Sequence, residues 1–389
     1  MLQLPESLLG SISYEEFLRD YWQKKPLFIK NAIPDFESPI DEHELAGLAL
    51  EEQVESRLVM ETGPNGEKWH LENGPFKEDR FNSLPESHWT LLVQAVDHYV
   101  PEVAALMEAF DFIPSWRVDD IMISYAPKEG SVGPHLDYYD VFLLQAQGSR
   151  RWQIGGFADD KTPFIPDVAL RILQEFDAME TFVCEPGDLL YLPPQLAHYG
   201  VSQTDDCMTW SVGFRAPSAD EIVTSLADFI GESLCEDDRY KDPDLTLQAH
   251  TSEISDEAIA RVKAIITEKL SNEATIKAWF GRYMTQPKYH DQLIAAEKPL
   301  TEAELIKEMA QGVVICISEG SRLAFSEAEN GLLLFADGDG FDVSVADKLI
   351  LLRLTEQKSL DESELYSSSN DFIGIILELL NRGTLYLSD

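Results

Sequence analysis

The sequence predicts an α+β fold in which a double-stranded β-helix (a jelly-roll, cupin-like barrel) is followed by helices. Two observations carry this prediction. Short apolar segments separated by turn residues follow one another from Val118 to Phe214, as in barrels built from many short strands. From Ser218 to about Tyr289, apolar residues recur instead at the helical spacing. We therefore expect the barrel to span about residues 115–217.

The part of the chain before the barrel is predicted to mix helices with short strands over residues 13–113. Ser13 and Glu16 have the spacing of a capping box, which predicts a helix that starts just before Phe17. From Trp89 to Phe110 the apolar residues repeat near the helical period, so we expect one long helix there. Together with the barrel, this part is assigned to a first domain, residues 1–217.

Three amphipathic helices are predicted after the barrel and are assigned to a second domain, residues 218–290. They cover Asp220–Ile230, Ile254–Leu270 and Ile276–Tyr283. Apolar faces on an appended helical segment often pair with a second copy of the chain. We therefore expect a homodimer.

The tail, residues 291–389, is predicted to form a third domain that resembles a winged helix. From Pro299 it shows the pattern of a helix, three short strands and a last helix, Phe372–Leu380, which Gly383 stops. Winged helices commonly bind DNA, but the acidity of this tail opposes that role. We expect a scaffold or a protein-contact module instead.

The composition disfavours membrane proteins, exported proteins and disulfide scaffolds. No apolar run reaches the roughly 18 residues of a membrane span, and the amino terminus lacks the basic and apolar regions of an export signal. The four cysteines (Cys184, Cys207, Cys235 and Cys316) form no closely spaced pair, which indicates reduced thiols. We expect a cytoplasmic protein with no membrane contact.

The charge of the chain is strongly negative. Asp and Glu number 70 and Lys and Arg number 30, for a net charge of −40. Such a surface repels nucleic-acid phosphates and attracts basic partners. The charge therefore disfavours direct DNA binding and favours a basic protein partner, although solubility in a salty or cold environment would select the same composition.

Two segments carry a candidate metal site, Gly133–Asp137 and Gly187–His198. Side chains two apart on a strand share a face, so His135 and Asp137 can bind one ion from one side. His198, just past a strand that Gly187 introduces, supplies a third ligand. Two histidines and a carboxylate form the facial triad of non-haem Fe(II) oxygenases, which leaves positions for a 2-oxo acid and dioxygen. A lone histidine is more often a hydrogen-bonded core residue, so the pairing of the two segments carries the prediction.

A cation for the cosubstrate is expected on the strand that follows. The apolar run Val141–Leu144 and the strand beginning at Arg150 are predicted to form a hairpin with its turn at Gly148 and Ser149. Arg150 and Arg151 face opposite sides of that strand, and we expect Arg150 to point into the barrel and Arg151 into solvent. A guanidinium binds carboxylates through two parallel hydrogen bonds, which suits the distal carboxylate of a dicarboxylic 2-oxo acid.

These residues resemble the Jumonji C type of 2-oxoglutarate oxygenases. In that family the cosubstrate-binding cation lies fifteen residues after the first iron histidine, which is the position of Arg150 relative to His135. The segments Phe17–Leu27, Arg117–Ser124 and Ser211–Pro217 are similar to the bacterial ribosomal oxygenases, and among these to the arginine hydroxylases of large-subunit ribosomal protein sixteen. The arginine, where many eukaryotic members carry lysine, points to a bacterial branch.

The resemblance implies a dioxygenase that depends on Fe(II) and 2-oxoglutarate and hydroxylates the β-carbon of an arginine in a basic ribosomal protein of the large subunit. It implies that His135, Asp137 and His198 bind iron, and that 2-oxoglutarate becomes succinate and carbon dioxide. It also implies the jelly-roll core and dimerisation through the helical segment.

Four further residues are assigned to the cavity. Strand parity groups Asp120 with Ser124, and Tyr139 with the first two metal ligands. Asp120 and Tyr139 offer a target arginine a carboxylate and an aromatic wall. Ser124 and Thr209 can hydrogen-bond the cosubstrate, although related bacterial enzymes carry asparagine at the position of Thr209. Each of the four can equally be a satisfied core polar group.

Three alternatives stay open. The first is another cupin-type metal enzyme, which would bring more histidines and would not need Arg150. The second is a histone-like protein demethylase, which differs from a hydroxylase in the carbon that faces the metal. The third is a non-catalytic adaptor, which has no reason to keep a complete set of metal ligands.

Overall fold

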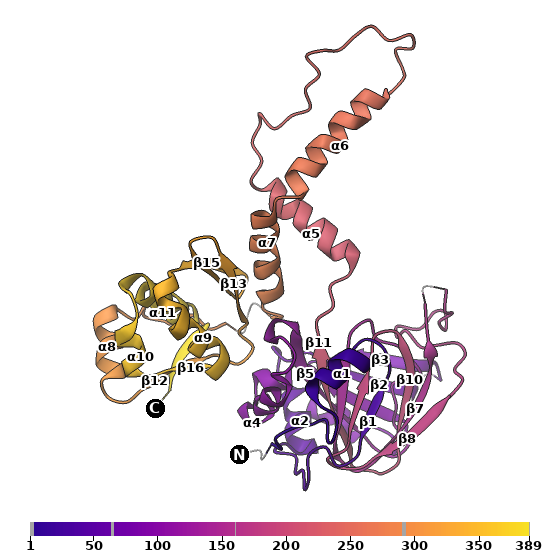
Figure 1. Ribbon diagram of the computed structural model, residues 1–389. Coiled ribbons are helices and arrows are strands. Elements are labelled where there is room, and N and C mark those ends of the chain that lie inside the picture. Colours follow the sequence, from indigo (N-terminus) through magenta and orange to yellow (C-terminus); the bar gives the residue numbers. More distant parts are fainter. Residues whose placement is uncertain (1–3, 64–65, 160, 290–292, 389) are drawn as a thin grey trace. The chain divides into compact units, whose positions relative to one another are not determined.

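The structure, a computed structural model, describes residues 4–63, 66–159, 161–289 and 293–388. The chain divides into two compact units (Figure 1). The first comprises Met1–Ala216 and Lys288–Gln292, and the second comprises Pro217–Pro287 and Leu293–Asp389. The assignment of three domains stays a prediction.

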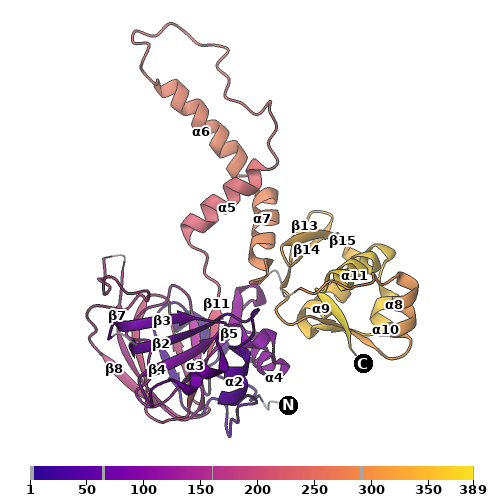
Figure 2. The ribbon, with the colours of Figure 1, turned by 180° about the vertical axis from the view of Figure 1, so that it is seen from behind.

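The first unit is built around two β-sheets, as the predicted jelly-roll barrel requires (Figures 1 and 2). The large sheet has the strand order β1-β9-β6-β11-β5-β4-β2-β3 and the small sheet has the order β10-β7-β8. Leu143 and Leu190 of the large sheet and Trp152 and Ile154 of the small sheet join one buried cluster, which shows that the two sheets face each other. The strands are β1 (Leu27–Ile29), β2 (Ser56–Thr62), β3 (Lys68–Asn73), β4 (Trp89–Val93), β5 (Val118–Ala126), β6 (Val141–Gln147), β7 (Arg150–Phe157), β8 (Glu180–Cys184), β9 (Leu189–Leu192), β10 (Leu196–Ser202) and β11 (Cys207–Phe214).

Short helices of the amino-terminal part cover the outer face of the large sheet. Phe17, Leu45 and Phe110 from these helices and Phe142 and Trp210 from the sheet belong to one buried cluster. The helices are α1 (Tyr14–Asp20), α2 (Glu42–Leu48), α3 (Glu78–Asn82), η1 (Val96–His98), α4 (Pro101–Ala104), η2 (Ala105–Phe110) and η3 (Ser115–Arg117). α1 begins as predicted, because the Ser13 hydroxyl accepts a hydrogen bond from the Glu16 amide at 3.2 Å.

The predicted hairpin at Gly148 is wrong. Among the strand pairs of the described residues, β6 pairs with β9 and β11, whereas β7 pairs with β8 and β10. The chain thus crosses from the large sheet to the small one at Gly148, which has φ +60°. A Cβ there would lie 2.3 Å from Thr204 Oγ1, so the crossing requires glycine. In a jelly roll, strands that follow each other along the chain often belong to different sheets, which local turn signals do not reveal.

The predicted long helix from Trp89 to Phe110 is also wrong at its start. β4 (Trp89–Val93) is a strand between β2 and β5 of the large sheet, and helical structure begins only at Val96. Residues 90–93 are all buried, so the strand shows no alternation of apolar and polar residues. A short apolar run buried on both faces cannot be distinguished from a helix by its period.

The second unit contains the three predicted helices followed by a mixed domain. α5 (Ala219–Gly231), α6 (Asp256–Leu270) and α7 (Glu273–Thr285) match the predicted segments, and α5 starts with a complete capping box. The last helix, α11 (Asn370–Arg382), ends at Gly383 with φ +85°, as predicted.

The mixed domain has two three-stranded sheets, β16-β12-β17 and β13-β14-β15, rather than three strands. Leu305, Leu351 and Ile376 are central members of its buried core. Its remaining elements are α8 (Glu302–Met309), β12 (Val314–Ile317), β13 (Leu323–Ala328), β14 (Gly331–Ala336), β15 (Asp339–Val343), η5 (Val345–Asp347), α9 (Lys348–Gln357), β16 (Ser359–Leu360), α10 (Glu362–Ser367) and β17 (Leu385–Ser388). Within the described residues, every helix is too short or too polar to cross a membrane.

Candidate metal centre

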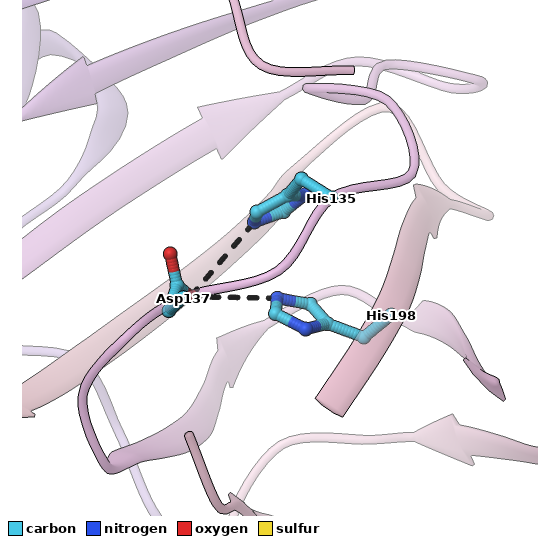
Figure 3. A group of neighbouring side chains, drawn as sticks. All are labelled: His135, Asp137 and His198. Carbon is cyan, nitrogen blue, oxygen red and sulfur yellow. Dashed lines mark ion pairs between the residues drawn. The ribbon is translucent and has the colours of Figure 1, made fainter. Parts of the chain in front are cut away.

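Three metal-ligating side chains, His135, Asp137 and His198, meet in the first unit (Figure 3). Their ligand atoms all lie within 4.8 Å of one another. Asp137 Oδ2 is 3.6 Å from His198 Nε2 and 4.0 Å from His135 Nε2. No other group of histidine, cysteine or acidic side chains in the described part of the chain meets this criterion.

The main chain holds the two histidines beside each other. The amide of each donates to the carbonyl of the other, at 3.0 Å and 2.9 Å, in an isolated antiparallel bridge. His198 comes after β9, the strand that Gly187 introduces, and it lies on the next strand, β10. Gly133–Asp137 forms this single bridge rather than the expected strand. The segment is extended only locally, which is enough to turn His135 and Asp137 to the same side.

Hydrogen bonds select the tautomer that binds metal. Nδ1 of His135 contacts the Gly133 carbonyl and Nδ1 of His198 contacts the Leu196 carbonyl, each at 2.9 Å. A carbonyl can only accept, so each Nδ1 carries the proton and each Nε2 keeps a lone pair. Burial, followed by the nearby His135, lowers the pKa of His198 to about 4, so this imidazole is neutral at neutral pH. Two imidazoles that turn Nε2 toward the site and one carboxylate fit Fe(II).

Arg150 is a buried cation on β7 of the small sheet. It is 3% exposed, and its Nε and Nη2 have no hydrogen-bond partner among the described residues. The Trp152 ring connects it to the metal site, because that ring lies 5.7 Å from the guanidinium and 5.8 Å from the His198 ring. An unpaired buried guanidinium is costly, and a carboxylate would satisfy it with two parallel hydrogen bonds. Arg151, which was expected in solvent, is half-buried.

Tyr139 follows the metal ligand Asp137 by two residues, and Asp120 lies on β5 of the large sheet. The Asp137 carboxylate first, then burial and then Asp120 raise the pKa of the Tyr139 hydroxyl. The Asp120 carboxylate is buried and accepts hydrogen bonds from Gln94 and Lys288, each at 2.8 Å. The Tyr139 side chain remains partly exposed to solvent.

Comparison with known proteins assigns the chain to a family. The profile of the JmjC domain matches residues 105–222, and that of the ROXA-like winged helix matches residues 268–386. The chain is 36% identical to the ribosomal protein uL16 3-hydroxylase of Escherichia coli (strain K12), over 80% of this chain and 82% of that protein. This chain is a ribosomal oxygenase of the JmjC type.

Other members of the family show the same likeness. A probable ribosomal oxygenase of Haemophilus influenzae is 35% identical over 94% of this chain and 91% of its own length. The structure of YcfD, a ribosomal oxygenase from Escherichia coli, in complex with cobalt and succinic acid has a TM-score of 0.85 and 32% identity. The YcfD structure with cobalt and 2-oxoglutarate has a TM-score of 0.84. Each structural match covers 97% of this chain and 99% of YcfD.

Ser124 and Thr209 form a buried polar group together with Gln145. The Ser124 hydroxyl donates to the Thr209 carbonyl at 3.3 Å, and the Thr209 hydroxyl donates to Gln145 Oε1 at 3.1 Å. All three residues lie on paired strands of the large sheet and share the parity of inward-facing positions. Ser124 and Thr209 thus have protein partners already, and their role toward a cosubstrate stays a prediction.

Three polar residues near the site were missed by reading the sequence. Gln145 could have been found, because it is a buried polar residue at an inward position of the apolar strand β6, whereas Gln147 lies at the end of that strand. Gln94 and Lys288 carry no such signal. Lys288 lies 168 residues from its partner Asp120, and no local pattern joins them.

Proposed function

We propose that this ribosomal oxygenase is an Fe(II)- and 2-oxoglutarate-dependent protein hydroxylase whose target is the β-carbon of an arginine in the basic ribosomal protein uL16. The observation that carries the reaction type is the cluster of His135, Asp137 and His198 in the same barrel as an unpaired buried arginine, Arg150. The target rests on the likeness to the uL16 3-hydroxylase over four fifths of both chains.

In this function the chain positions the reactants and supplies no acid or base. His135, Asp137 and His198 would hold Fe(II), and Arg150 would bind the distal carboxylate of 2-oxoglutarate. Bound Fe(II) supplies the oxidation, in which 2-oxoglutarate and dioxygen give succinate, carbon dioxide and one oxygen atom inserted into a C–H bond. The Trp152 ring lies 5.7 Å from the Arg150 guanidinium and 5.8 Å from the His198 ring, so it adjoins both proposed binding positions.

The function is tested with the purified full chain, Fe(II), 2-oxoglutarate and isolated uL16. We expect succinate to form in step with a protein product that is heavier by one oxygen atom on an arginine. Formaldehyde release from a methylated histone-like protein would support the demethylase alternative. Absence of succinate under all conditions would support the adaptor.

Recognition of the target arginine is proposed for Asp120 and Tyr139. A guanidinium offers a planar fork to a carboxylate and a flat face to a phenol, whereas an ammonium offers neither. We expect Asp120→Asn to weaken binding of an arginine peptide by about 2 kcal/mol or more, the scale for one partner of a buried charge pair. Peptide KM values, compared with those of the exposed charge control Asp237→Asn, measure this. Equal use of arginine and lysine peptides by the unmodified enzyme would reject the arginine assignment.

A homodimer through the helical segment is proposed as well. Ile259, Val262 and Ile266 are exposed on α6 at spacings that place them on one face, and Val223 is exposed on α5. Burial of this stripe against a second copy would remove it from water.

The dimer is tested with the double substitution Val262→Asp and Ile266→Asp. We expect it to convert the protein to a monomer, because each new carboxylate would be desolvated in the interface. Light scattering coupled to gel filtration measures the mass. Ala264→Asp, on the opposite face of α6, is the matched control and is expected to leave the mass unchanged. A double variant that keeps the mass of a dimer would place the interface elsewhere.

A basic ribosomal protein also suits the net charge of −40, because long-range attraction speeds the encounter of oppositely charged proteins. The proposed site of action is the cytoplasm, where ribosomal proteins are assembled. Direct binding of the winged helix to DNA is disfavoured by the same charge.

A further inference from the structure

Lys288 contacts Asp120, the residue proposed to bind the substrate, although the two are far apart in the sequence. Lys288–Gln292 belongs to the first unit, although the residues on both sides belong to the second. Lys288 Nζ donates to Asp120 Oδ2 at 2.8 Å and to Asp119 Oδ2 at 3.0 Å. The hydroxyl of the next residue, Tyr289, donates to Glu55 Oε2 at 2.7 Å, which is a second hydrogen bond from this segment to the first unit. Lys288 is therefore a fixed part of the first unit.

The two oxygens of Asp120 are used unequally. Oδ2 accepts from Gln94 Nε2 and from Lys288, each at 2.8 Å. Among the described residues, Oδ1 accepts only the longer contact from Gln94, at 3.1 Å. A carboxylate oxygen can accept about two hydrogen bonds, so Oδ1 keeps one position. Gly213 adjoins this oxygen, because a Cβ there would lie 3.9 Å from Oδ1.

Lys288 lies between two carboxylates. Asp119 and Asp120 contribute two negative charges and Lys288 one positive charge. Burial lowers the pKa of Lys288, but Asp120 and Asp119 together raise it above the ordinary value, so the ammonium stays charged. Burial, followed by Asp120, raises the pKa of the neighbouring Asp97 to about 8, so that carboxyl is largely neutral at neutral pH. Lys288 is thus a charged partner shared between the Asp119 and Asp120 carboxylates.

We propose that Lys288 is a specificity-determining residue, which fills the ammonium position between Asp119 and Asp120 and leaves Oδ1 of Asp120 to the guanidinium of a target arginine. This inference rests on the proposed function of Asp120. An ammonium binds as a compact point charge, and the internal lysine already holds the place where a substrate lysine would bind. A guanidinium can instead donate to Oδ1 while its flat face lies against Tyr139. Lys288 acts through Asp120 and is a positioning residue.

The test uses the full chain loaded with Fe(II) and 2-oxoglutarate without dioxygen, so that peptide binding is measured without turnover. Two peptides differ only in arginine or lysine at the target position. For Lys288→Met we expect the Kd of the arginine peptide to rise roughly tenfold, the scale for loss of an outer positioning partner. The preference for arginine over lysine should fall as well, because the vacated position can accept a substrate ammonium.

Three controls separate this role from a general loss of charge or fold. Lys298→Met removes a lysine whose side chain is 83% exposed and should leave both Kd values unchanged. Lys288→Arg keeps the charge and should restore most of the affinity for the arginine peptide. In an Asp120→Asn background, Lys288→Met should add little further loss, because residues that act through each other are not additive. Should Lys288→Met fail to fold, Lys288→Gln carries the same comparison.

The outcomes are distinguishable. If Asp120→Asn weakens arginine binding while Lys288→Met changes neither the Kd nor the preference, the inference is overturned and the proposed function stands. A lower Kd in Lys288→Met would also overturn it, because Lys288 would then compete with the substrate. If Asp120→Asn itself has no effect, the proposed role of Asp120 fails and the inference fails with it.

Discussion

Replacement of Asp137 by alanine is expected to abolish metal binding and to lower 2-oxoglutarate turnover by more than about a hundredfold, beyond the cost of losing an outer-shell partner. Asp137 is the carboxylate that both imidazoles face, at 3.6 Å and 4.0 Å. Without it, two neutral histidines would have to hold a divalent ion alone. His135→Ala and His198→Ala are expected to have the same effect. Bound Fe(II), measured by metal analysis after desalting, and succinate formation check this.

The matched control is His88→Ala, which removes an imidazole that is exposed and pairs with Glu129 outside the metal cluster. It should retain both metal and turnover. Thermal unfolding of each variant shows whether the fold is intact. Full activity of folded Asp137→Ala protein would remove the metal assignment, because the remaining two histidines do not make a facial triad.

Replacement of Arg150 by alanine is expected to weaken binding of 2-oxoglutarate by roughly 2–4 kcal/mol, the scale for losing one partner of a desolvated charge pair. The guanidinium is buried and its Nε and Nη2 have no partner in the part of the chain that the structure describes, so the cosubstrate carboxylate would be their main contact. Metal content should change little, because Arg150 is not a ligand. Titration of the metal-loaded protein with 2-oxoglutarate measures the Kd.

Arg151→Ala provides the comparison, since Arg151 is the next residue on β7 and faces the other way. It removes the same charge and should change the Kd of 2-oxoglutarate little. If Arg151→Ala weakens binding more than Arg150→Ala, the inward-facing arginine has been assigned to the wrong residue.

The alternation of side chains along extended segments predicted much of the site from the sequence. Alternation separates Arg150 from Arg151, and the structure buries the first fully and the second by half. It also places Asp120 and Ser124 on one face of β5, where both are buried. The same argument correctly predicted that His135 and Asp137 point to the same side, although their segment is not a strand. Side chains alternate between two sides wherever the backbone is extended, so this alternation does not require a paired neighbouring strand.

Long-range pairing could not be read from the sequence. The turn at Gly148 was located, yet the partners of β6 and β7 depend on which sheet each strand joins. β4 was taken for a helix because burial on both faces removes the alternation that identifies a strand. The contact between Lys288 and Asp120 spans 168 residues and depends on the path of the chain after α7. Such contacts follow from tertiary structure and leave no local pattern.

The first unit is made of two stretches of the sequence that are not consecutive. The chain leaves this unit after Ala216, forms α5 to α7, and returns for Lys288–Gln292 before it leaves again. A fragment that ended at residue 216 would contain every strand of the barrel but would lack the ammonium that pairs with the buried Asp120 carboxylate. We therefore expect such a fragment to be less stable than one that retains Lys288. A cut compatible with its electrostatics lies after residue 292, so the three helices are inherited together with the barrel.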